Sequence, residues 1–407
     1  MITSDLRRAL AGAVAAAGLA HPPPGADPGL RPASEPGLPG RYAASVALSL
    51  GPDPRAIARV LAATLAAEPW IETAEVTGPG YLTITVTRDA LAAVAARITS
   101  AGPACATSEA LAGRTVAAPQ EGDPLTAPTW EKARAALAAQ LTARLAAAAG
   151  ATVADPGAAE RLRVPPPAHS DSQPGGARNR SDDSPSGQDA DPRRQETPAT
   201  SGGLGGSSHR EAAEGFGGSS PREARGGYGG SSSPREACGG YGGSSPRKAT
   251  AFAGRDAVLF TLARAIPGRP LRVEEPVIAR HVPGNPAYAV RYAHARAASG
   301  ERWGEIAALR CLPADPAELA LLDALSWLPE RVATAARRDR PDEFARYLED
   351  LASVTIDVLT TPRDPGCAAD PGRAPAPGSD RLSLASAART GLAAGLGLLG
   401  VSSPDRL

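Results

Sequence analysis

The chain has 407 residues, with 43 basic and 43 acidic side chains, so its formal net charge at pH 7 is zero. This balance excludes a strongly basic nucleic-acid coat protein and an acidic solvating protein. Glycine and proline number 44 and 41, whereas aromatic residues make up only 4 % of the chain. This composition argues against large cores and favours small folded regions joined by segments without a core.

The four cysteines are far apart in the sequence, and no two of them form a CxxC pair; they are Cys105, Cys238, Cys311 and Cys367. A zinc ribbon, an iron–sulfur site and a disulfide framework all need closer or paired cysteines. We therefore expect no metal, no cofactor and a reducing compartment, the cytoplasm. The apolar stretch 382–401 is interrupted by Arg389 and contains four glycines, so we expect it not to span a membrane.

Residues 1–105 are predicted to form a small α+β domain. Asp53 and Pro54 have the residue types of a helix N-cap and first helical position. Residues 81–87 alternate strictly between apolar residues and threonines or tyrosine, which predicts a strand after the turn at 78–80. Asp89 is expected to cap a last helix. Residues 106–165 contain one clear predicted helix, from about Thr129 to Ala149.

Residues 166–250 are of low complexity. An imperfect repeat of 12 or 13 residues, rich in glycine and serine, begins at Gly205, Gly217, Gly229 and Gly242. A repeat this short cannot bury a core of its own, so the sequence predicts a disordered linker of about 85 residues. Tyrosine, phenylalanine and arginine recur within the repeats, which leaves open weak RNA binding or an inert tether.

Residues 251–407 are predicted to be all-helical. Asn285-Pro286, Asp315-Pro316 and Pro341 each have the residue types that begin a helix. The first of these helices is expected to stop at Gly300. Apolar residues at helical spacing continue to the C-terminus, which favours a bundle of four or five helices.

This helical region resembles the DALR anticodon-binding domain of arginyl-tRNA synthetases. The resemblance rests on short segments in the same order and at similar spacing: Gly254-Arg-Asp-Ala-Val258, Asn285-Pro-Ala-Tyr288, Arg291-Tyr-Ala-His-Ala-Arg296, Tyr347-Leu-Glu-Asp-Leu-Ala352 and Leu398-Leu-Gly-Val401. The N-terminal region resembles the appended N-terminal domain of the same enzymes, through Gly40-Arg-Tyr-Ala43, Pro54-Arg55 and Gly78-Pro-Gly-Tyr81. In that family the appended domain contacts the outer corner of the tRNA.

The catalytic part of such an enzyme is not recognisable in the sequence. Class I synthetases carry a His-x-Gly-His motif and a lysine-rich KMSKS-type loop, which stabilise charge on the phosphates. The two lysines here, Lys132 and Lys248, lie in no such loop, and no two of the five histidines are close enough. Residues 106–165 are interpreted as a degenerate start of the catalytic domain, with Thr129 and Lys132 at the two histidine positions. We therefore predict that the chain is not an enzyme, although family membership alone suggests an arginine–tRNA ligase.

The predicted binding residues fall into two groups. The first is the densest cluster of arginines in a predicted folded region, which is interpreted either as a phosphate contact or as a solvated helix end: Arg331, Arg337, Arg338 and Arg340. The second consists of residues matched to the family, each interpreted either as a tRNA contact or as a packing residue: Tyr42, Tyr81, Tyr288, Arg291 and Tyr347. Thr355, Val358 and Leu359 stand where the family has aromatic residues, which indicates a depleted stacking surface.

Two functions follow from this resemblance. The first is a non-catalytic tRNA-binding protein, with arginine tRNA as the expected partner and the two terminal domains holding the elbow and the anticodon arm. The second is a protein–protein adaptor that binds a partner such as a synthetase. The neutral charge favours the second, because residues 254–407 contain 19 basic and 19 acidic side chains. The pairing of two tRNA-binding domains favours the first. We expect neither DNA nor membrane binding.

Overall fold

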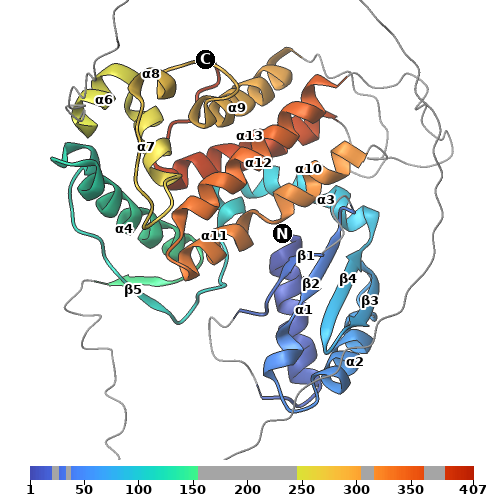
Figure 1. Cartoon of the computed structure of the whole chain (residues 1–407). Helices are drawn as coiled ribbons and strands as arrows, with labels where there is room; N and C mark the ends of the chain where they lie inside the picture. The colour runs from blue at the N-terminus through green and yellow to red at the C-terminus, as the bar shows by residue number, and fades with distance from the viewer. Residues whose placement is uncertain (21–26, 34–37, 155–244, 304–315, 362–380) are drawn as a thin grey trace, which may run out of the picture. The chain divides into compact units, whose positions relative to one another are not determined.

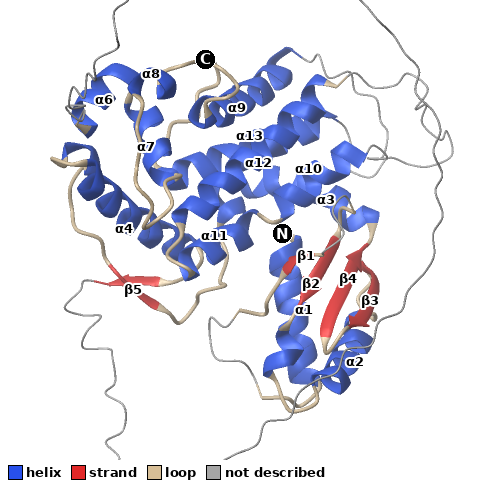
Figure 2. Ribbon diagram, viewed as in Figure 1, coloured by secondary structure: helices blue, strands red, loops and turns tan. Residues whose placement is uncertain are grey.

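The computed structural model describes residues 1–20, 27–33, 38–154, 245–303, 316–361 and 381–407. Over these residues it is mostly helical, with two small sheets (Figures 1 and 2). The helices are α1 (Ile2–Ala16), α2 (Pro54–Leu65), α3 (Arg88–Ala101), α4 (Trp130–Ala148), α6 (Pro246–Ala253), α7 (Arg255–Ala263), α8 (Glu275–Ile278), α9 (Pro286–Trp303), α10 (Pro316–Ser326), α11 (Leu328–Arg337), α12 (Pro341–Thr360) and α13 (Arg381–Leu399). Short 3-10 helices are η1 (Val46–Ser49), η2 (Gly102–Ala106) and η3 (Pro124–Thr126).

The N-terminal region is an α+β fold, as the sequence predicts. Four antiparallel strands lie in the order β1-β2-β4-β3: β1 (Arg31–Pro32), β2 (Arg41–Ala44), β4 (Tyr81–Val86) and β3 (Ile71–Thr77). The alternation in β4 is confirmed, because Leu82, Ile84 and Val86 are all buried. The turn before β4 requires glycine at Gly80, which has a φ of +143° and lies so close to Pro54 that a Cβ would sit 2.7 Å from it.

One of the two predicted helix caps in this region is confirmed and the other is wrong. The Asp53 side chain accepts a hydrogen bond from the Ala56 N–H at 3.0 Å and caps α2. At α3 the cap is Thr87, whose Oγ1 accepts from the Ala90 N–H at 3.2 Å, and Asp89 lies in the first turn instead. Thr87 is the last extended residue before the helix, and an N-cap residue needs that extended backbone.

The next region contains a βαβ unit whose strands the sequence analysis missed. Strands β5 (Thr115–Ala117) and β6 (Thr152–Ala154) pair in parallel, with α4 between them in the chain. A parallel pair needs a crossover of this kind. Each strand has only three residues, too few to show a pattern of alternation in the sequence.

The C-terminal region is all-helical over its described residues, as predicted, but these residues hold seven helices from α7 to α13, where four or five were expected. Helix α9 continues past Gly300 to Trp303, and the helix expected from Pro316 ends at Ser326, with α11 following from Leu328. Helix α6 begins inside the predicted linker: the Ser245 Oγ accepts from the Lys248 N–H at 3.4 Å, and Pro246 takes the first helical position. Residues 166–244 of the predicted linker lie outside the described residues.

Helix α13 contains a segment, Leu382–Leu399, that is long and apolar enough to cross a membrane by length and composition. Arg389 and the four glycines therefore do not by themselves exclude a membrane-spanning helix. Half of the segment is buried inside the fold, where it packs against α3, α9 and α12. Gly391 and Gly395 allow close packing against α10 and α12, because a Cβ at either position would lie within 3 Å of Leu325 or Leu348. These contacts are those of a core helix.

The two ends of the chain share one core. The described residues up to 154 and from 245 onward belong to a single compact unit, and one continuous cluster of buried apolar side chains runs through it. Helix α3 packs against α10 and α13, and α4 packs against α7 and α11. The described residues on the two sides of residue 105 therefore share one continuous core.

Asp323 of α10 is the polar centre of this junction. Its Oδ1 accepts hydrogen bonds from the Gly40 N–H at 3.2 Å and from the Tyr42 hydroxyl at 3.1 Å. The Tyr42 hydroxyl also lies 2.9 Å from the Ser326 Oγ, and the Thr3 hydroxyl donates to the Ser326 carbonyl at 2.9 Å. Burial raises the pKa of Asp323 above its usual value, and the two hydrogen bonds oppose that rise.

We predict that Asp323→Asn becomes progressively more stable relative to the wild type as pH rises above about 4. A folded-state pKa above the unfolded one means that the folded wild type holds the proton more tightly. Its free energy of unfolding therefore falls as pH rises through the window between the two values. Asparagine can accept both hydrogen bonds without carrying a charge. Urea denaturation at pH 4 and pH 7 tests this, with the exposed Asp350→Asn as a control; the same stability difference at both pH values contradicts it.

Candidate nucleic-acid interface

Three aromatic rings form an open stack beside α9, which we call the aromatic column: His281, Tyr288 and Tyr292. The ring centroids of His281 and Tyr288 are 5.4 Å apart with planes 12° from parallel, and those of Tyr288 and Tyr292 are 5.6 Å apart at 17°. His281 is exposed, Tyr288 is half-buried, and Tyr292 is 37 % exposed. The column is thus held together by its own rings and open to solvent.

Two local features position the column. Tyr288 and Tyr292 are four residues apart on α9, so their side chains lie one above the other on the same face. The buried Asn285 holds the loop before α9 by donating from Nδ2 to the Ile278 carbonyl at 2.8 Å and to the Arg280 carbonyl at 2.7 Å. This loop places His281 against Tyr288. Because a loop histidine has no periodic relation to the helix that follows, the sequence analysis did not single it out.

Stacked rings that remain open to solvent suit unpaired nucleotide bases. Every base has a flat face that stacks on an aromatic side chain, whatever its sequence. Of the predicted residues, Tyr288 is therefore placed where a base contact is geometrically possible. Tyr288 is half-buried and its ring stacks on Tyr292, so the geometry is compatible with both packing and base contact.

Arg291, one residue before Tyr292, ties the end of the chain to the bundle. Its Nη2 lies 3.3 Å from the Asp256 carboxylate and 3.4 Å from the Ser402 hydroxyl, which also contacts Asp256. His294 lies 3.0 Å from the Pro404 carbonyl through Nδ1, and burial lowers its pKa. The last residues of the chain are thus bound to α9, and Arg291 is engaged in holding them.

The predicted arginine cluster is largely neutralised by carboxylates. Arg337 is only 13 % exposed, and its Nη1 lies 2.9 Å from Asp27 and 3.9 Å from the buried Glu330. Arg340 forms a bidentate pair with the buried Asp342, through Nε at 2.7 Å and Nη2 at 2.8 Å. Charge-assisted bidentate pairs of this kind are strong and specific in geometry.

The other two arginines of the cluster differ in exposure. The Arg331 guanidinium lies over two rings, 5.5 Å from the centroid of Trp327 and 5.9 Å from that of Tyr347, as a cation–π contact. Arg338 is 52 % exposed and lies 3.2 Å from Glu343. Of the four, Arg338 alone keeps most of its side chain open to solvent, so the geometry favours packing and pairing for the cluster over a shared phosphate site.

The remaining predicted tyrosines lie apart from the column. Tyr42 is fully buried at the Asp323 junction, with its ring 5.2 Å from Trp327. Tyr347 is buried, and its hydroxyl donates to the Ala324 carbonyl at 2.8 Å, while burial raises its pKa. Tyr81 is 43 % exposed at the start of β4. For Tyr42 and Tyr347 the structure therefore supports packing, and Tyr81 remains accessible.

Two of the three positions expected to form a depleted stacking surface face the core, and the third, Leu359, is half-buried. Thr355 and Val358 are buried, and the Thr355 hydroxyl donates to the Leu351 carbonyl at 2.7 Å. Side chains at these two positions of α12 do not reach solvent, so their identity does not decide how much aromatic surface is open.

The start of α4 has the geometry of a helix cap. Thr129, placed at the first histidine position of the synthetase motif, accepts a hydrogen bond from the Lys132 N–H at 3.3 Å through Oγ1. Glu131 lies in the first turn, where the helix dipole favours an acidic residue. Among the described residues no group of three or more histidine, cysteine, aspartate or glutamate side chains is placed to hold a metal ion.

Comparison with known proteins relates the C-terminal helices to one family. Residues 290–407 match the model of the DALR anticodon binding domain. An arginine–tRNA ligase of Bifidobacterium longum subsp. infantis is 34 % identical over 182 residues, covering 38 % of this chain and 28 % of the ligase. The ligase of Frankia alni is 36 % identical over 164 residues, covering 38 % of this chain and 29 % of the ligase. The chain thus spans less than a third of the length of these relatives.

A solved structure of the arginyl-tRNA synthetase of Thermus thermophilus also matches, with 28 % identity and a TM-score of 0.32, over 42 % of this chain and 29 % of that one. The family match over residues 290–407 and the sequence relatives relate the helical C-terminal part to the DALR anticodon-binding domain and to arginyl-tRNA synthetases. The resemblance on which the sequence analysis relied is confirmed for this part.

We predict that substitutions of two arginines of the cluster change the free energy of unfolding by different amounts. Arg337→Ala should lower the free energy of unfolding by about 1–3 kcal/mol, because it removes a mostly buried partner of Asp27 and Glu330. The neighbouring Arg338→Ala should change it by less than about 0.5 kcal/mol, because that side chain is mostly in solvent. Urea denaturation measures both. If both substitutions change the free energy of unfolding by the same negligible amount, the Arg337 guanidinium is not held by the fold and is available to bind phosphates.

Proposed function

We propose that the chain is a non-catalytic tRNA-binding protein that holds unpaired bases of the anticodon arm on the aromatic column. The observation that carries this proposal is the stack of His281, Tyr288 and Tyr292, open to solvent where the DALR match begins at residue 290. Arginine tRNA is the expected binding partner, because the relatives that match this domain are named arginine–tRNA ligases.

The charge distribution favours stacking over phosphate contacts as the main source of affinity. The chain is neutral, and most of the charge of the Arg331–Arg340 cluster is compensated by carboxylates. Base–aromatic stacking contributes about 1–3 kcal/mol per base, and it does not require a basic surface. Binding through the column should accordingly depend less on salt than binding through several phosphates.

The non-catalytic part of the proposal rests on the start of α4 and on the sequence. Thr129 and Lys132 stand at the histidine positions of the family motif, and Thr129 is engaged in capping the helix. A nucleotide-binding fold is a broad parallel sheet with helices on both faces. In the described part of the chain, parallel pairing is confined to the three-residue strands β5 and β6.

A protein partner, such as a synthetase, is the second candidate. Phe252 of α6 is 62 % exposed, and Val277 and Val282 near α8 are each 44 % exposed. Helices α6 and α8 are in contact, so these apolar side chains belong to neighbouring elements. An exposed apolar group of this kind is typical of a surface that meets another protein.

We predict that Tyr292→Ala weakens binding of an arginine tRNA anticodon stem–loop by about 5- to 150-fold, which corresponds to the loss of one stacked base. Tyr292→Phe should bind like the wild type, because it keeps the ring. Phe252→Ala is the matched control for removing an exposed aromatic side chain, and it should leave RNA affinity unchanged. Fluorescence titration of labelled RNA measures all three. Equal affinities for Tyr292→Ala and wild type would exclude the column as the RNA site.

We also predict that the purified chain does not aminoacylate tRNA. With arginine, ATP and homologous tRNA it should give neither pyrophosphate exchange nor charged tRNA, because the phosphate-stabilising motifs are missing from its sequence. The assay needs a protein preparation from which the arginyl-tRNA synthetase of the expression host has been removed by affinity depletion. Turnover that persists in that preparation would contradict the non-catalytic proposal and leave the stacking proposal intact.

A further inference from the structure

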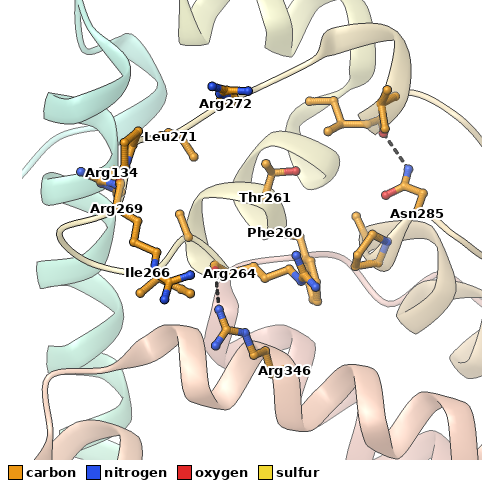
Figure 3. A pocket seen from close by; sticks show the side chains of 16 residues that line it. Arg134, Phe260, Thr261, Arg264, Ile266, Arg269, Leu271, Arg272, Asn285 and Arg346 are labelled. Atoms are coloured by element: carbon orange, nitrogen blue, oxygen red, sulfur yellow. Dashed lines mark hydrogen bonds between the residues drawn. The ribbon is translucent and has the colours of Figure 1, made fainter.

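A pocket of about 400 Å³ lies among α4, α7, α12 and the loop between α7 and α9 (Figure 3). Five of the residues that line it are arginines, and none is an aspartate or a glutamate: Arg134, Arg264, Arg269, Arg272 and Arg346. They come from α4, α12, the C-cap of α7 and the loop that follows it, so their convergence follows from the tertiary fold. Such a concentration of one charge is unexpected in a chain whose net charge is zero.

Backbone carbonyls hold two of these arginines in place. The Arg134 Nη1 donates to the Arg269 carbonyl at 2.6 Å, and the Arg346 Nη2 donates to the Arg264 carbonyl at 3.4 Å (Figure 3). These contacts orient each guanidinium without neutralising it, and they leave its other N–H groups available, since a guanidinium has five donors. Arg346 also lies 3.6 Å from Asp342, and that carboxylate is shared with Arg340.

The other three arginines differ in whether their charge is paired with a carboxylate. Arg264 is paired through Nε with Glu349 at 2.5 Å. Arg269 and Arg272 are exposed on the loop, and their side chains form no ion pair or hydrogen bond with any residue that the structure describes. Among the ion pairs of the described residues, these five guanidiniums have two carboxylate partners, Glu349 and Asp342, and Asp342 is shared with Arg340, so more positive than paired negative charge lies at the pocket.

We propose that this pocket binds phosphate oxyanions carrying more than one negative charge. Guanidinium groups match phosphate oxygens in geometry and form paired, charge-assisted hydrogen bonds with them. A single carboxylate would satisfy only one or two of the arginines. The ring of Phe260 and the loop close part of the pocket, whose volume suits a small ligand or a short run of backbone phosphates.

Two sources of such a ligand share this chemistry: a free polyphosphate, and consecutive phosphates of an RNA backbone. The pocket and the aromatic column share the segment around Asn285, which lines the pocket and fixes the loop that carries His281. One RNA strand can thus place its phosphates in the pocket and a base on the column. The proposal goes beyond base stacking and does not depend on it.

The test is the affinity of the full chain for inorganic pyrophosphate, measured by isothermal titration calorimetry at constant ionic strength. We expect binding by the wild type and at least about a tenfold rise in Kd for Arg269→Gln/Arg272→Gln, because both side chains are exposed and have no partner to lose. Arg55→Gln/Arg59→Gln removes two exposed arginines from α2 and serves as the charge-matched control, with wild-type affinity expected. Arg272→Lys keeps the charge but loses the guanidinium geometry, and it should bind more weakly than the wild type.

No pyrophosphate binding by the wild type, or equal affinity in the wild type and Arg269→Gln/Arg272→Gln, would overturn the proposal. Competition identifies the source of the phosphate. If pyrophosphate displaces labelled tRNA, the pocket holds backbone phosphates; if both bind at once, it holds a free polyphosphate. A chain that binds pyrophosphate and no tRNA would retain this site while the proposed function fails.

Discussion

The continuous core between the two ends of the chain is the constraint on which the rest of the structure depends. Residues far apart in the sequence meet at Asp323, where Gly40 and Tyr42 donate to one carboxylate. Nearby, Glu330 pairs with Arg7 at 2.6 Å and lies 3.9 Å from Arg337. Because apolar packing continues on both sides of these polar contacts, the N-terminal sheet and the C-terminal helices stabilise each other. Side chains that pair with one another at this junction are not available to bind a ligand. Only the polar and charged side chains outside the junction are therefore candidates for ligand binding.

For ligand binding, the arginines fall into two groups: those that are paired within the fold and those that remain open to solvent. Arg331, Arg337 and Arg340 are dense in the sequence, yet rings and carboxylates of the same fold engage them. Arg269 and Arg272 are less conspicuous in the sequence, but the fold gathers them with three other arginines. Charge density along the chain is therefore a poor guide to an electrostatic surface, whereas the exposed column offers a site whose binding energy needs no net charge.

Much of the fold could be predicted from local patterns. The alternation in β4, the Asp53–Pro54 helix start and the Pro341 helix start each depend on a few neighbouring residues. The short strands β5 and β6 and the break between α10 and α11 left no comparable pattern. The site was harder to predict: Tyr288 was identified by resemblance, whereas His281 joins it only because Asn285 fixes the loop. The roles of Tyr42 and Arg337 depend on partners that are distant in sequence, Asp323 and Asp27, and no local pattern indicates those contacts.

We propose that unpaired bases of tRNA stack on the rings of His281, Tyr288 and Tyr292. The most direct measurement is photocrosslinking of an arginine tRNA that carries 4-thiouridine in the anticodon loop, followed by mass spectrometry of the linked peptides. We expect the crosslinks to fall within the segment that spans the aromatic column, residues 281–292. Crosslinks confined to the N-terminal sheet, or to helices remote from α9, would contradict the claim.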